Sequence, residues 1–456
     1  MGRLMYQNID FMNPGKILLL GGNFAPEPTG IGKYNGEMMA WLADRGFECS
    51  VVTTYPYYPY WKVQEPYRAK SWFFSKERHL TTTGEITIYR CPHFVPPTPS
   101  GVKRMISDLT FFVSAFLRVL TLLFVRKYDY IITVVPPFQL GLLGIFIKFF
   151  RGGKLIYHIQ DLQIDAARDL DMIKSKSLLK AMFGIERYIL RKSDYLSSIS
   201  EGMIVKIMKK YHKPVLFFPN WVDTSSVFPI AERNDLKALF GFPSDRKIVL
   251  YSGAIGEKQG LEQILETAEN LNSEKVTFII AGSGPYKEKL TALARVKGLT
   301  NVYFMPLQPK EKFNQFLNMA DLHLVLQKTS ANDLVMPSKL SSILAVGGLV
   351  IVTAPRKTSL YEMLTKHDMG ILVEPENQLE LSQAIRTAIT HPFDHVRRNA
   401  ALFAYSYLSI DRILPAFLSE TSMAMNNPQM IEKIIVTPTN LGGSFVLKSA
   451  DDLIEN

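Results

Sequence analysis

Short apolar runs recur along the chain, and stretches with helical spacing of apolar residues separate most of them. We interpret each run as a buried strand, because glycine, proline or polar residues bound it. In the first half the runs lie at 16–22, 50–54, 86–91, 130–135, 154–159, 195–200 and 215–219. Strands that alternate with helices predict a parallel sheet in a doubly wound α/β domain.

A second series of the same kind begins after the segment 219–230, whose prolines and small polar residues are typical of an inter-domain linker. The second series predicts strands at 248–251, 276–282, 302–306, 322–327, 350–354 and 370–373. We therefore expect two doubly wound domains, at 16–222 and 223–400. We interpret residues 1–15 as an N-terminal extension and residues 423–456, which lose the alternation, as a partly ordered tail.

The second series opens on a strand that leads through a glycine turn into a helix. Gly253 and Gly256 lie in this turn, followed by Lys258 and Gln259, which can donate hydrogen bonds. The backbone N–H groups of such a turn and the helix N-terminus form a ready site for a phosphate.

A similar unit occurs near the start of the chain, where Gly30 and Gly32 precede a helical pattern. Two such units far apart in the sequence indicate two similar domains that face one ligand. The glycines lack the complete GxGxxG spacing, and no acidic residue ends the second strand, so a dinucleotide site is not expected here.

Two further clusters extend the predicted phosphate site. In AGSGP, Gly282 and Gly284 follow a strand, where they would allow close backbone approach. In MPSKL, Pro337 suits a first helical turn, Ser338 is a candidate cap, and Lys339 stands where an anion would bind. Together these features describe a diphosphate cradle. Taken singly, each glycine is more often ordinary turn chemistry.

The segment YHIQDLQID supplies the candidate catalytic residues, His158 and Asp161. Both lie at the end of a predicted strand, where the ligand sites of α/β sheets gather. A single histidine in a strand is often a core residue, so both interpretations of His158 remain open. Asp161 begins the loop and is therefore better placed to reach a ligand.

The segment 109–125 is almost wholly apolar, is interrupted by Arg118 and has basic residues on both sides. It is slightly short for a spanning helix, which needs about 20 apolar residues. A helix on a membrane surface, a buried core helix and a true span are the three alternatives, in that order of preference. The aromatic, proline-rich segment 55–67 is expected to be a loop that stacks on a sugar, binds a lipid headgroup or packs on its own domain.

Composition narrows the function class. Of the 456 residues, 47% are hydrophobic and 21% are charged, which is typical of a globular protein. The net charge of +10 suits nucleic acid, an anionic membrane or phosphorylated substrates. The chain has no basic block interleaved with aromatic residues, so nucleic acid is disfavoured. Its two cysteines offer no metal-ligand spacing and fit a reducing compartment, and residues 1–16 lack the apolar core of a secretory signal.

Several motifs are similar to those of the retaining glycosyltransferases of family 4, which have the GT-B fold. The motifs are GIGKYNGEM, FPNWVD, YSGAIGEKQGLEQ, AGSGP and PSKLSSILAVGG, and the match runs from about residue 16 to 420. The resemblance implies two Rossmann-like domains that face each other across a cleft, with a C-terminal helix, at 401–422, that crosses back to the N-terminal domain.

For function, the resemblance implies a metal-independent hexosyltransferase without a cofactor. Its donor would be a GDP- or UDP-sugar held by the C-terminal domain. Its acceptor would be a lipid-linked oligosaccharide at the inner face of the cytoplasmic membrane, to which the enzyme attaches peripherally. The product would be an exopolysaccharide of the colanic-acid type.

The chain departs from the usual family pattern at its charged positions. Ala254 and Gln259 stand where many members have arginine and lysine, and Leu334 and Ser342 stand where they have glutamates. The resemblance places Gln160, rather than His158, where the family usually has a histidine before an aspartate. Lys258 and Lys339 are the expected replacements for the missing diphosphate charges. A binding subunit that has lost catalysis and a nucleotide-sugar epimerase remain as alternatives.

Overall fold

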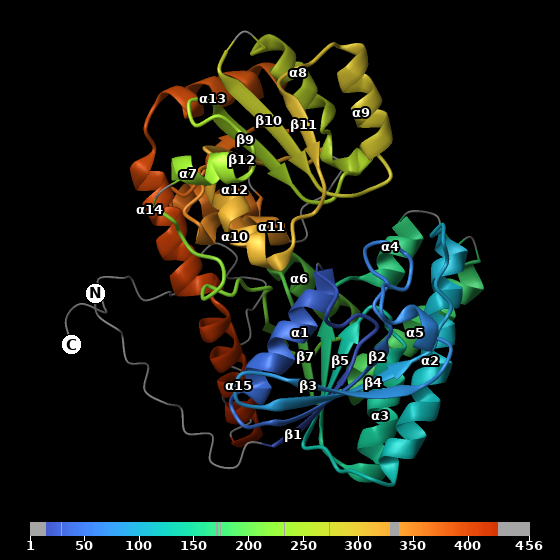
Figure 1. Cartoon of the computed structure of the whole chain (residues 1–456). Helices are drawn as coiled ribbons and strands as arrows, with labels where there is room; N and C mark the ends of the chain where they lie inside the picture. Colours follow the sequence, from blue (N-terminus) through green and yellow to red (C-terminus); the bar gives the residue numbers. More distant parts are fainter. Residues whose placement is uncertain are drawn as a thin grey trace, which may run out of the picture.

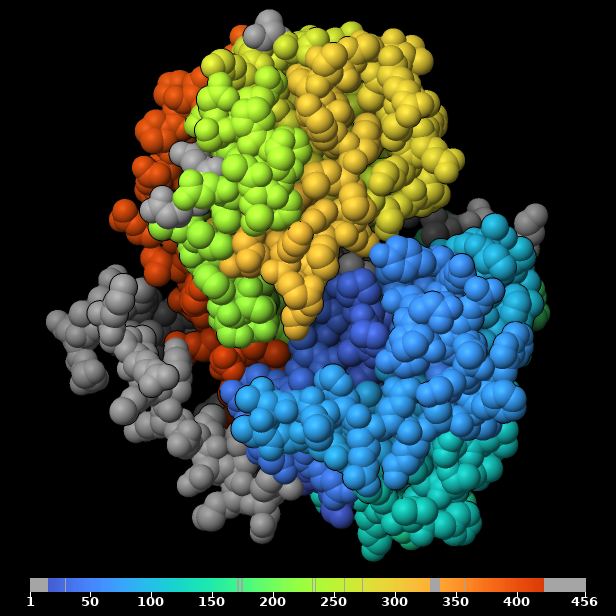
Figure 2. Space-filling model, in the orientation of Figure 1, coloured from blue at the N-terminus to red at the C-terminus, as the bar shows by residue number. Residues whose placement is uncertain are grey.

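Two α/β domains lie one above the other, joined by a linker and by the successive C-terminal helices α14 (Asp394–Phe403) and α15 (Ile410–Asn426), which together run along one side of both (Figure 1). The computed structural model describes residues 15–28, 30–169, 172–173, 175–231, 233–272, 274–328, 337–356 and 358–426. Within this part, the side chains at 234, 258 and 422–426 are not described. In the space-filling view the surface is hollowed where the two domains meet (Figure 2).

The N-terminal domain is built on an eight-stranded sheet of order β3-β4-β2-β1-β5-β6-β7-β8. All neighbouring strands are parallel except the antiparallel pair β3 and β4. The strands are β1 (Lys16–Leu20), β2 (Glu48–Thr54), β3 (Ser75–Leu80), β4 (Glu85–Cys91), β5 (Tyr130–Val135), β6 (Lys154–Ile159), β7 (Tyr195–Ser198) and β8 (Val215–Phe217). The helices are α1 (Gly30–Ala43), α2 (Gly101–Leu123), α3 (Leu140–Arg151), α4 (Gln163–Asp169), α5 (Lys176–Lys192) and α6 (Glu201–Lys210), with a short 3₁₀ turn, η1 (Arg68–Lys70).

The C-terminal domain has a parallel six-stranded sheet of order β11-β10-β9-β12-β13-β14. Its strands are β9 (Lys247–Ser252), β10 (Val276–Ala281), β11 (Val302–Met305), β12 (Leu322–Val325), β13 (Val350–Thr353) and β14 (Ile371–Val373). Its helices are α7 (Arg233–Leu239), α8 (Glu262–Asn270), α9 (Lys287–Val296), α10 (Lys310–Asn318), α11 (Ser338–Ala345), α12 (Ser359–Lys366), α13 (Gln378–Thr390) and α14 (Asp394–Phe403), with the 3₁₀ turn η2 (Glu257–Gln259). In each sheet the chain reverses its direction of winding beside the first strand, as in doubly wound folds.

The prediction of two doubly wound α/β domains is confirmed, and each predicted strand corresponds to a strand of the structure. Strand β3 was missed. Its sequence, SKERHL, is polar and mostly exposed, because β3 is the antiparallel edge of the sheet and buries no face against a helix. An edge strand of this kind carries no apolar pattern that the sequence could reveal.

The C-terminal helix α15 (Ile410–Asn426) follows a π-helical turn, η3 (Ala404–Leu408), and packs against the N-terminal domain. Its apolar face enters that domain's core, where Phe417 stacks on Phe218 with ring centroids 3.9 Å apart. The linker is held beside it, because the Val222 amide donates to the Leu408 carbonyl (2.8 Å) and the Ile410 amide donates to the Val222 carbonyl (3.0 Å). The two chain crossings therefore form one paired connection.

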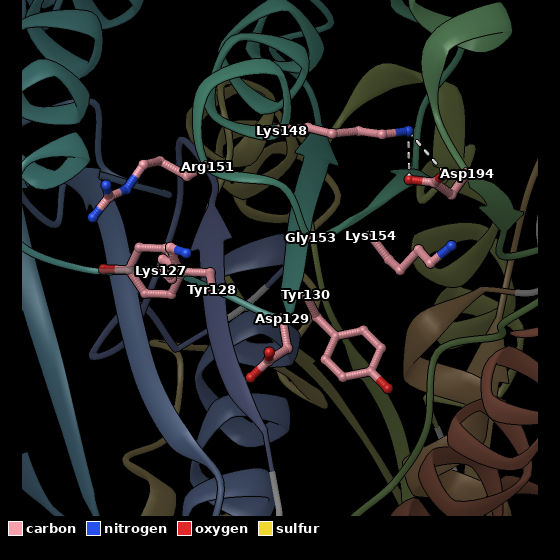
Figure 3. A pocket seen from close by; sticks show the side chains of 9 residues that line it. All are labelled: Lys127, Tyr128, Asp129, Tyr130, Lys148, Arg151, Gly153, Lys154 and Asp194. Atoms are coloured by element: carbon pink, nitrogen blue, oxygen red, sulfur yellow. Dashed lines mark hydrogen bonds and ion pairs between the residues drawn. The ribbon is translucent and has the colours of Figure 1, made fainter.

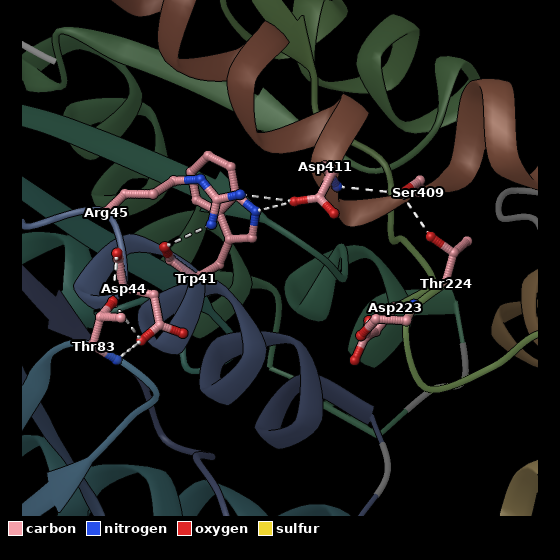
Figure 4. A network of polar contacts seen from close by, with 9 residues as sticks. Trp41, Asp44, Arg45, Thr83, Asp223, Thr224, Ser409 and Asp411 are labelled. Atoms are coloured by element: carbon pink, nitrogen blue, oxygen red, sulfur yellow. Dashed lines mark hydrogen bonds and ion pairs between the residues drawn. The ribbon is translucent and has the colours of Figure 1, made fainter. Parts of the chain in front are cut away.

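A polar network fixes α15 to α1 (Figure 4). Asp411 accepts hydrogen bonds from Trp41 Nε1 (2.7 Å) and from the Arg45 guanidinium (2.9 Å). The guanidinium lies over the Trp41 ring, 3.5 Å from its centroid. One carboxylate thus joins two residues of the N-terminal domain to the returning helix.

Replacing Asp411 with alanine is expected to lower the free energy of unfolding by about 1 kcal/mol, because the indole N–H and the guanidinium both lose their acceptor. Denaturant unfolding followed by tryptophan fluorescence measures this loss. Asp245→Ala is the matched control, since its ion pair with Lys275 is exposed and should contribute much less to stability. Equal effects of the two substitutions would contradict the assigned role of Asp411.

Candidate active site

The turns that follow β9 and β10 pack directly against each other. The Gly253 amide donates to the Ala281 carbonyl and the Ile255 amide donates to the Ser283 carbonyl, both at 2.9 Å. A Cβ on Gly282 would lie 1.9 Å from the Gly253 carbonyl oxygen, and one on Gly284 would lie 2.2 Å from that of Ile255. Both glycines have φ near +150°. Here glycine is required by contact between two backbones.

Lys339 extends from the first turn of α11 to the β9 turn. Its Nζ atom lies 3.8 Å from the centroid of the Tyr251 ring, and a Cβ on Gly253 would lie 3.5 Å from its Cδ atom. In the described part of the chain, no carboxylate forms an ion pair with this ammonium group. Desolvation lowers the pKa of Lys339 to about 7. Lys339 and Gly253 are thus brought together, and desolvation disfavours the charged form of the lysine.

Ser338 has a different position from the predicted one. Pro337, with extended backbone (φ −56°, ψ 121°), is the N-cap of α11, and Ser338 is the first helical residue. The Ser338 side chain instead lies close to the hydroxyl of Tyr34 on α1, a residue whose pKa is raised by burial. Because Pro337 occupies the cap position, the Ser338 side chain is not used for capping. It instead approaches Tyr34 of the other domain.

This contact shows how the two sheets face each other. Helix α1 follows the carboxyl end of β1, and α11 follows that of β12, so the contact joins the carboxyl edges of both sheets. The Tyr34 ring packs edge-on against Trp221 of the linker, with centroids 5.4 Å apart. The carboxyl edges are where parallel sheets bind their ligands.

In the turn after β9, the side chain of Gln259, a predicted ligand donor, forms a hydrogen bond within the turn. Gln259 Oε1 accepts a hydrogen bond from the Gly256 amide (3.1 Å), and a Cβ on Gly256 would lie 2.8 Å from the same oxygen. Gln259 therefore stabilises the turn through an N–H group that we had expected to face a phosphate. The side chain of Lys258 lies outside the described part of the structure, as do Leu334 and Met336.

The first glycine turn makes room for a carboxyl group that sequence reasoning missed. Gly30 has φ of +63° and begins α1, and a Cβ on Gly32 would lie 2.4 Å from Glu27 Oε2. Glu27 is buried and accepts hydrogen bonds from the amides of Tyr57 (3.0 Å) and Tyr58 (2.9 Å). Burial raises the pKa of Glu27 to about 7. Only its place between two prolines before a helix marks Glu27 in the sequence.

Glu27 therefore fixes the aromatic loop to the first glycine turn. Within that loop, the Tyr57 ring packs at 5.5 Å from Trp61 and 5.0 Å from His93, whereas Tyr60 is 55% exposed. The loop thus packs largely on its own domain, and the Tyr60 ring remains exposed.

His158 and Asp161 have opposite environments. His158 is buried, its Nδ1 atom lies 3.0 Å from Ser197 Oγ, and its ring packs 5.0 Å from Phe218. Burial lowers its pKa to about 3, so the ring is neutral at physiological pH. These contacts favour the alternative of a core histidine.

Asp161 is exposed at the carboxyl end of β6. Desolvation raises the pKa of its carboxyl group, a hydrogen bond from the Leu162 amide opposes this, and the charge of Asp165 adds to the rise. Asp165 itself forms ion pairs with Lys210 and Arg168, whereas the described residues provide no basic partner for Asp161. Asp161 therefore presents an exposed carboxyl group, without a basic partner among the described residues, at the carboxyl edge of the sheet.

Comparison with known proteins agrees with this architecture. Residues 29–221 match the model of the Glycosyl transferase 4-like domain, and residues 232–403 match that of Glycosyl transferases group 1. The chain is 38% identical over 418 residues to the colanic acid biosynthesis glycosyl transferase WcaI of Escherichia coli (strain K12), covering 89% of this chain and 99% of that protein.

Solved structures show the same fold at low sequence identity. Sucrose-phosphate synthase from Thermosynechococcus elongatus aligns with a TM-score of 0.68 at 16% identity, covering 90% of this chain and 100% of that one. Alr3699/HepE from Anabaena, solved in complex with UDP and glucose, aligns with a TM-score of 0.64 at 15% identity and the same coverage. The chain therefore belongs to the group 1 glycosyl transferases and is a glycosyltransferase with the GT-B fold.

Proposed function

We propose that this glycosyltransferase moves a sugar from a GDP- or UDP-sugar to a lipid-linked oligosaccharide during synthesis of an exopolysaccharide of the colanic-acid type. The E. coli relative named for colanic acid biosynthesis, matched over 99% of its length, supports the pathway. The Anabaena neighbour with UDP and glucose supports the donor class. We place the reaction at the cytoplasmic face of the membrane and assign it a retaining outcome.

The observation that carries the donor assignment is the position of Lys339. Its ammonium group lies at the β9 turn, beside a glycine backbone and near the N-terminus of α11, without a carboxylate partner among the described residues. When the bond between the sugar and the diphosphate breaks, the electron pair stays on the phosphate oxygen and the sugar gains oxocarbenium character. A cation already in position stabilises that leaving group.

Asp161 is the residue that we assign to the sugar side of the reaction. Its carboxyl group is exposed at the edge of the N-terminal sheet that faces the C-terminal domain. There it can accept hydrogen bonds from hydroxyl groups of the donor or the acceptor. His158 is better explained as a structural residue, since Ser197 and Phe218 enclose it.

Donor binding is expected to weaken as the pH rises. Desolvation lowers the pKa of Lys339 to about 7, and the diphosphate of a nucleotide sugar binds the protonated lysine. Above pH 7 the lysine must take up a proton to bind, so affinity should fall by up to about tenfold per pH unit. Below about pH 6 it should be constant.

Calorimetry with the nucleotide sugar from pH 5.5 to 9 measures this dependence, since the diphosphate diester itself does not titrate in the range. Lys339→Arg is the matched control, because arginine keeps its charge throughout. A wild-type affinity that does not change with pH would remove Lys339 from the diphosphate site.

A donor screen tests the proposed reaction as a whole. Purified full-length protein is incubated with each of several GDP- and UDP-sugars and with membrane lipids as the acceptor source, and mass spectrometry follows the products. Release of nucleoside diphosphate together with a lipid-linked product heavier by one sugar supports the proposal. Binding without transfer would indicate a subunit that has lost catalysis, as the replacements Ala254 and Gln259 would allow. Conversion of the donor without an acceptor would indicate an epimerase.

A further inference from the structure

Helix α2 carries an exposed apolar stripe along its full length. The stripe repeats at intervals of three or four residues as far as Leu117 and then at seven, which is two helical turns, so its members lie on one face of the helix. Its members, each between 45% and 87% exposed, are Val102, Ile106, Leu109, Val113, Leu117 and Phe124 at the helix end. We call them the α2 stripe. Such a continuous apolar surface is unusual on a protein that remains free in water.

The opposite face of α2 belongs to the domain core. Phe111, Ala115 and Val119 are buried in it and pack under the sheet. The arginine that interrupts the apolar sequence also turns inward, since its guanidinium carbon lies 5.0 Å from the Phe74 ring and 5.4 Å from the Tyr89 ring. Among the described residues, α2 is the one helix long and apolar enough to cross a bilayer. One face of it, about a third of the apolar window, is buried in the N-terminal domain, so α2 packs on this domain as a surface helix.

Aromatic residues of α3 widen the stripe at its C-terminal end. Phe116 of α2 packs 5.3 Å from Phe146, which packs 4.9 Å from Phe150. Phe149 is 81% exposed and lies next in this series, 5.0 Å from Phe150. The exposed apolar surface therefore continues from α2 onto α3.

A basic hollow lies where these two helices end, beside the amino ends of β5 and β6 (Figure 3). Its volume is about 470 Å³, and Lys127, Arg151 and Lys154 line it. Lys127 follows the stripe by three residues. The Arg151 guanidinium donates to the Arg126 carbonyl (3.4 Å), which connects the end of α3 to the segment after α2.

The acidic groups of the hollow are already bound to the protein. Asp194 pairs with Lys148 (2.7 Å) and accepts from the Leu155 amide (2.7 Å), and Asp129 accepts from the Lys16 amide (2.7 Å). In the described part of the chain, the cations of Lys127, Arg151 and Lys154 have no carboxylate partner. The hollow is therefore positive, at the edge of an exposed apolar surface.

We propose that this surface docks on an anionic lipid bilayer, with the α2 stripe and Phe149 in the interface and a lipid phosphate headgroup in the basic hollow. Apolar residues that enter the bilayer surface next to basic groups at headgroup level are the arrangement that binds anionic membranes. The hollow is a headgroup site at the amino edge of the sheet, far from the carboxyl edge that holds the candidate active site.

Docking through the α2 stripe also sets how the candidate active site lies relative to the membrane. The first turn of α2 contacts the aromatic loop, since the Arg104 guanidinium lies 4.9 Å from the Trp61 ring. The stripe thus runs from that loop, at the domain junction, to the headgroup hollow. If the acceptor is lipid-linked, as in the proposed function, this orientation presents its headgroup to the junction from the side of α2.

Vesicle flotation of the full-length protein tests the docking surface without any donor or acceptor. Wild-type protein should float with vesicles of phosphatidylcholine and phosphatidylglycerol, and much less with phosphatidylcholine alone. The double variant Phe124→Ser, Phe149→Ser should lower the partition coefficient at least tenfold on both vesicle types. The triple variant Lys127→Ala, Arg151→Ala, Lys154→Ala should lower the partition coefficient about 10²-fold on the anionic vesicles and leave it unchanged on phosphatidylcholine alone.

Matched controls lie on the C-terminal domain. Val296 and Leu379 are 85% and 79% exposed, so replacing both with serine removes similar apolar area outside the surface and should not change flotation. Circular dichroism confirms that each variant is folded.

Three results would overturn docking on lipid. They are equal flotation of the wild type on both vesicle types, flotation unaffected by the α2 and α3 variants, and a dimer in solution that the phenylalanine variants dissociate. Sugar transfer to a detergent-dispersed acceptor is measured separately. Loss of flotation with intact transfer would contradict the docking surface but not the proposed reaction. Normal flotation without transfer would contradict the proposed reaction but not the docking surface.

Discussion

Replacing Lys339 with alanine is expected to reduce kcat/KM for the nucleotide sugar by about 10²–10³-fold, the loss usual for removing one preorganised group that stabilises transition-state charge. The reason is geometric. The Lys339 side chain lies at the β9 turn, beside the Gly253 backbone and over the Tyr251 ring. Fold should be retained, because the side chain forms no ion pair within the described residues. Steady-state kinetics and thermal unfolding measure the two effects.

The control for this substitution is Lys312→Ala, which removes an exposed lysine from α10 of the same domain and should leave kcat/KM unchanged. Lys339→Arg should recover part of the activity, since it restores the charge with a different shape. Wild-type turnover in Lys339→Ala would exclude the lysine from the mechanism.

The Gly282→Ala variant is expected to lose stability and donor binding together. Its Cβ would lie 1.9 Å from the Gly253 carbonyl oxygen, which belongs to backbone and cannot rotate away. The β9 and β10 turns would have to separate, at a free energy of roughly 3 kcal/mol for an overpacked site with unfavourable φ. Because the displaced turn is the one beneath Lys339, nucleotide affinity should fall as well. Denaturant unfolding and calorimetry measure the two losses.

A second glycine separates the backbone clash from the effect of positive φ. Gly298 has φ of +63°, and an added Cβ there would meet no atom within 4 Å. Gly298→Ala should therefore lower stability by about 1 kcal/mol and leave nucleotide affinity unchanged. If both variants lose equal stability, contact between the turns is not what requires glycine at 282.

Most of the fold could be predicted because buried parallel strands carry their signal in local sequence. Runs such as that of β9 are apolar and bounded by glycine, so their position follows from the pattern alone. Strand β3 shows the limit, since its residues face solvent and pair only along one edge. For α2, composition left three alternatives, and only the packing of Phe111 and Val119 showed which face is buried.

The candidate site was predictable in part. The glycine turns and Lys339 were found because each stands at a recognisable point between a strand and a helix, and the structure brings Lys339 and Gly253 together. Their roles in donor binding stay predictions. Ser338 and Gln259 have other partners, Tyr34 and Gly256, which no local pattern could reveal because one contact crosses between domains.

Glu27 illustrates the same limit from the opposite direction. Its acceptor role depends on the amides of Tyr57 and Tyr58, which lie about thirty residues away in sequence. Nothing in the local pattern distinguishes this buried carboxyl from a solvated one. Residues whose function is to hold two loops together are visible only once the loops are in place.

The most direct test of the diphosphate site compares ligands with and without the diphosphate in two proteins. Calorimetry is performed with UDP against uridine, and with GDP against guanosine, on the wild type and on Lys339→Met. We predict that the wild type prefers the matching diphosphate to its nucleoside by at least about 10²-fold and that the methionine variant loses most of this preference while nucleoside binding is unchanged. An equal preference in both proteins would contradict the placement of the diphosphate at Lys339.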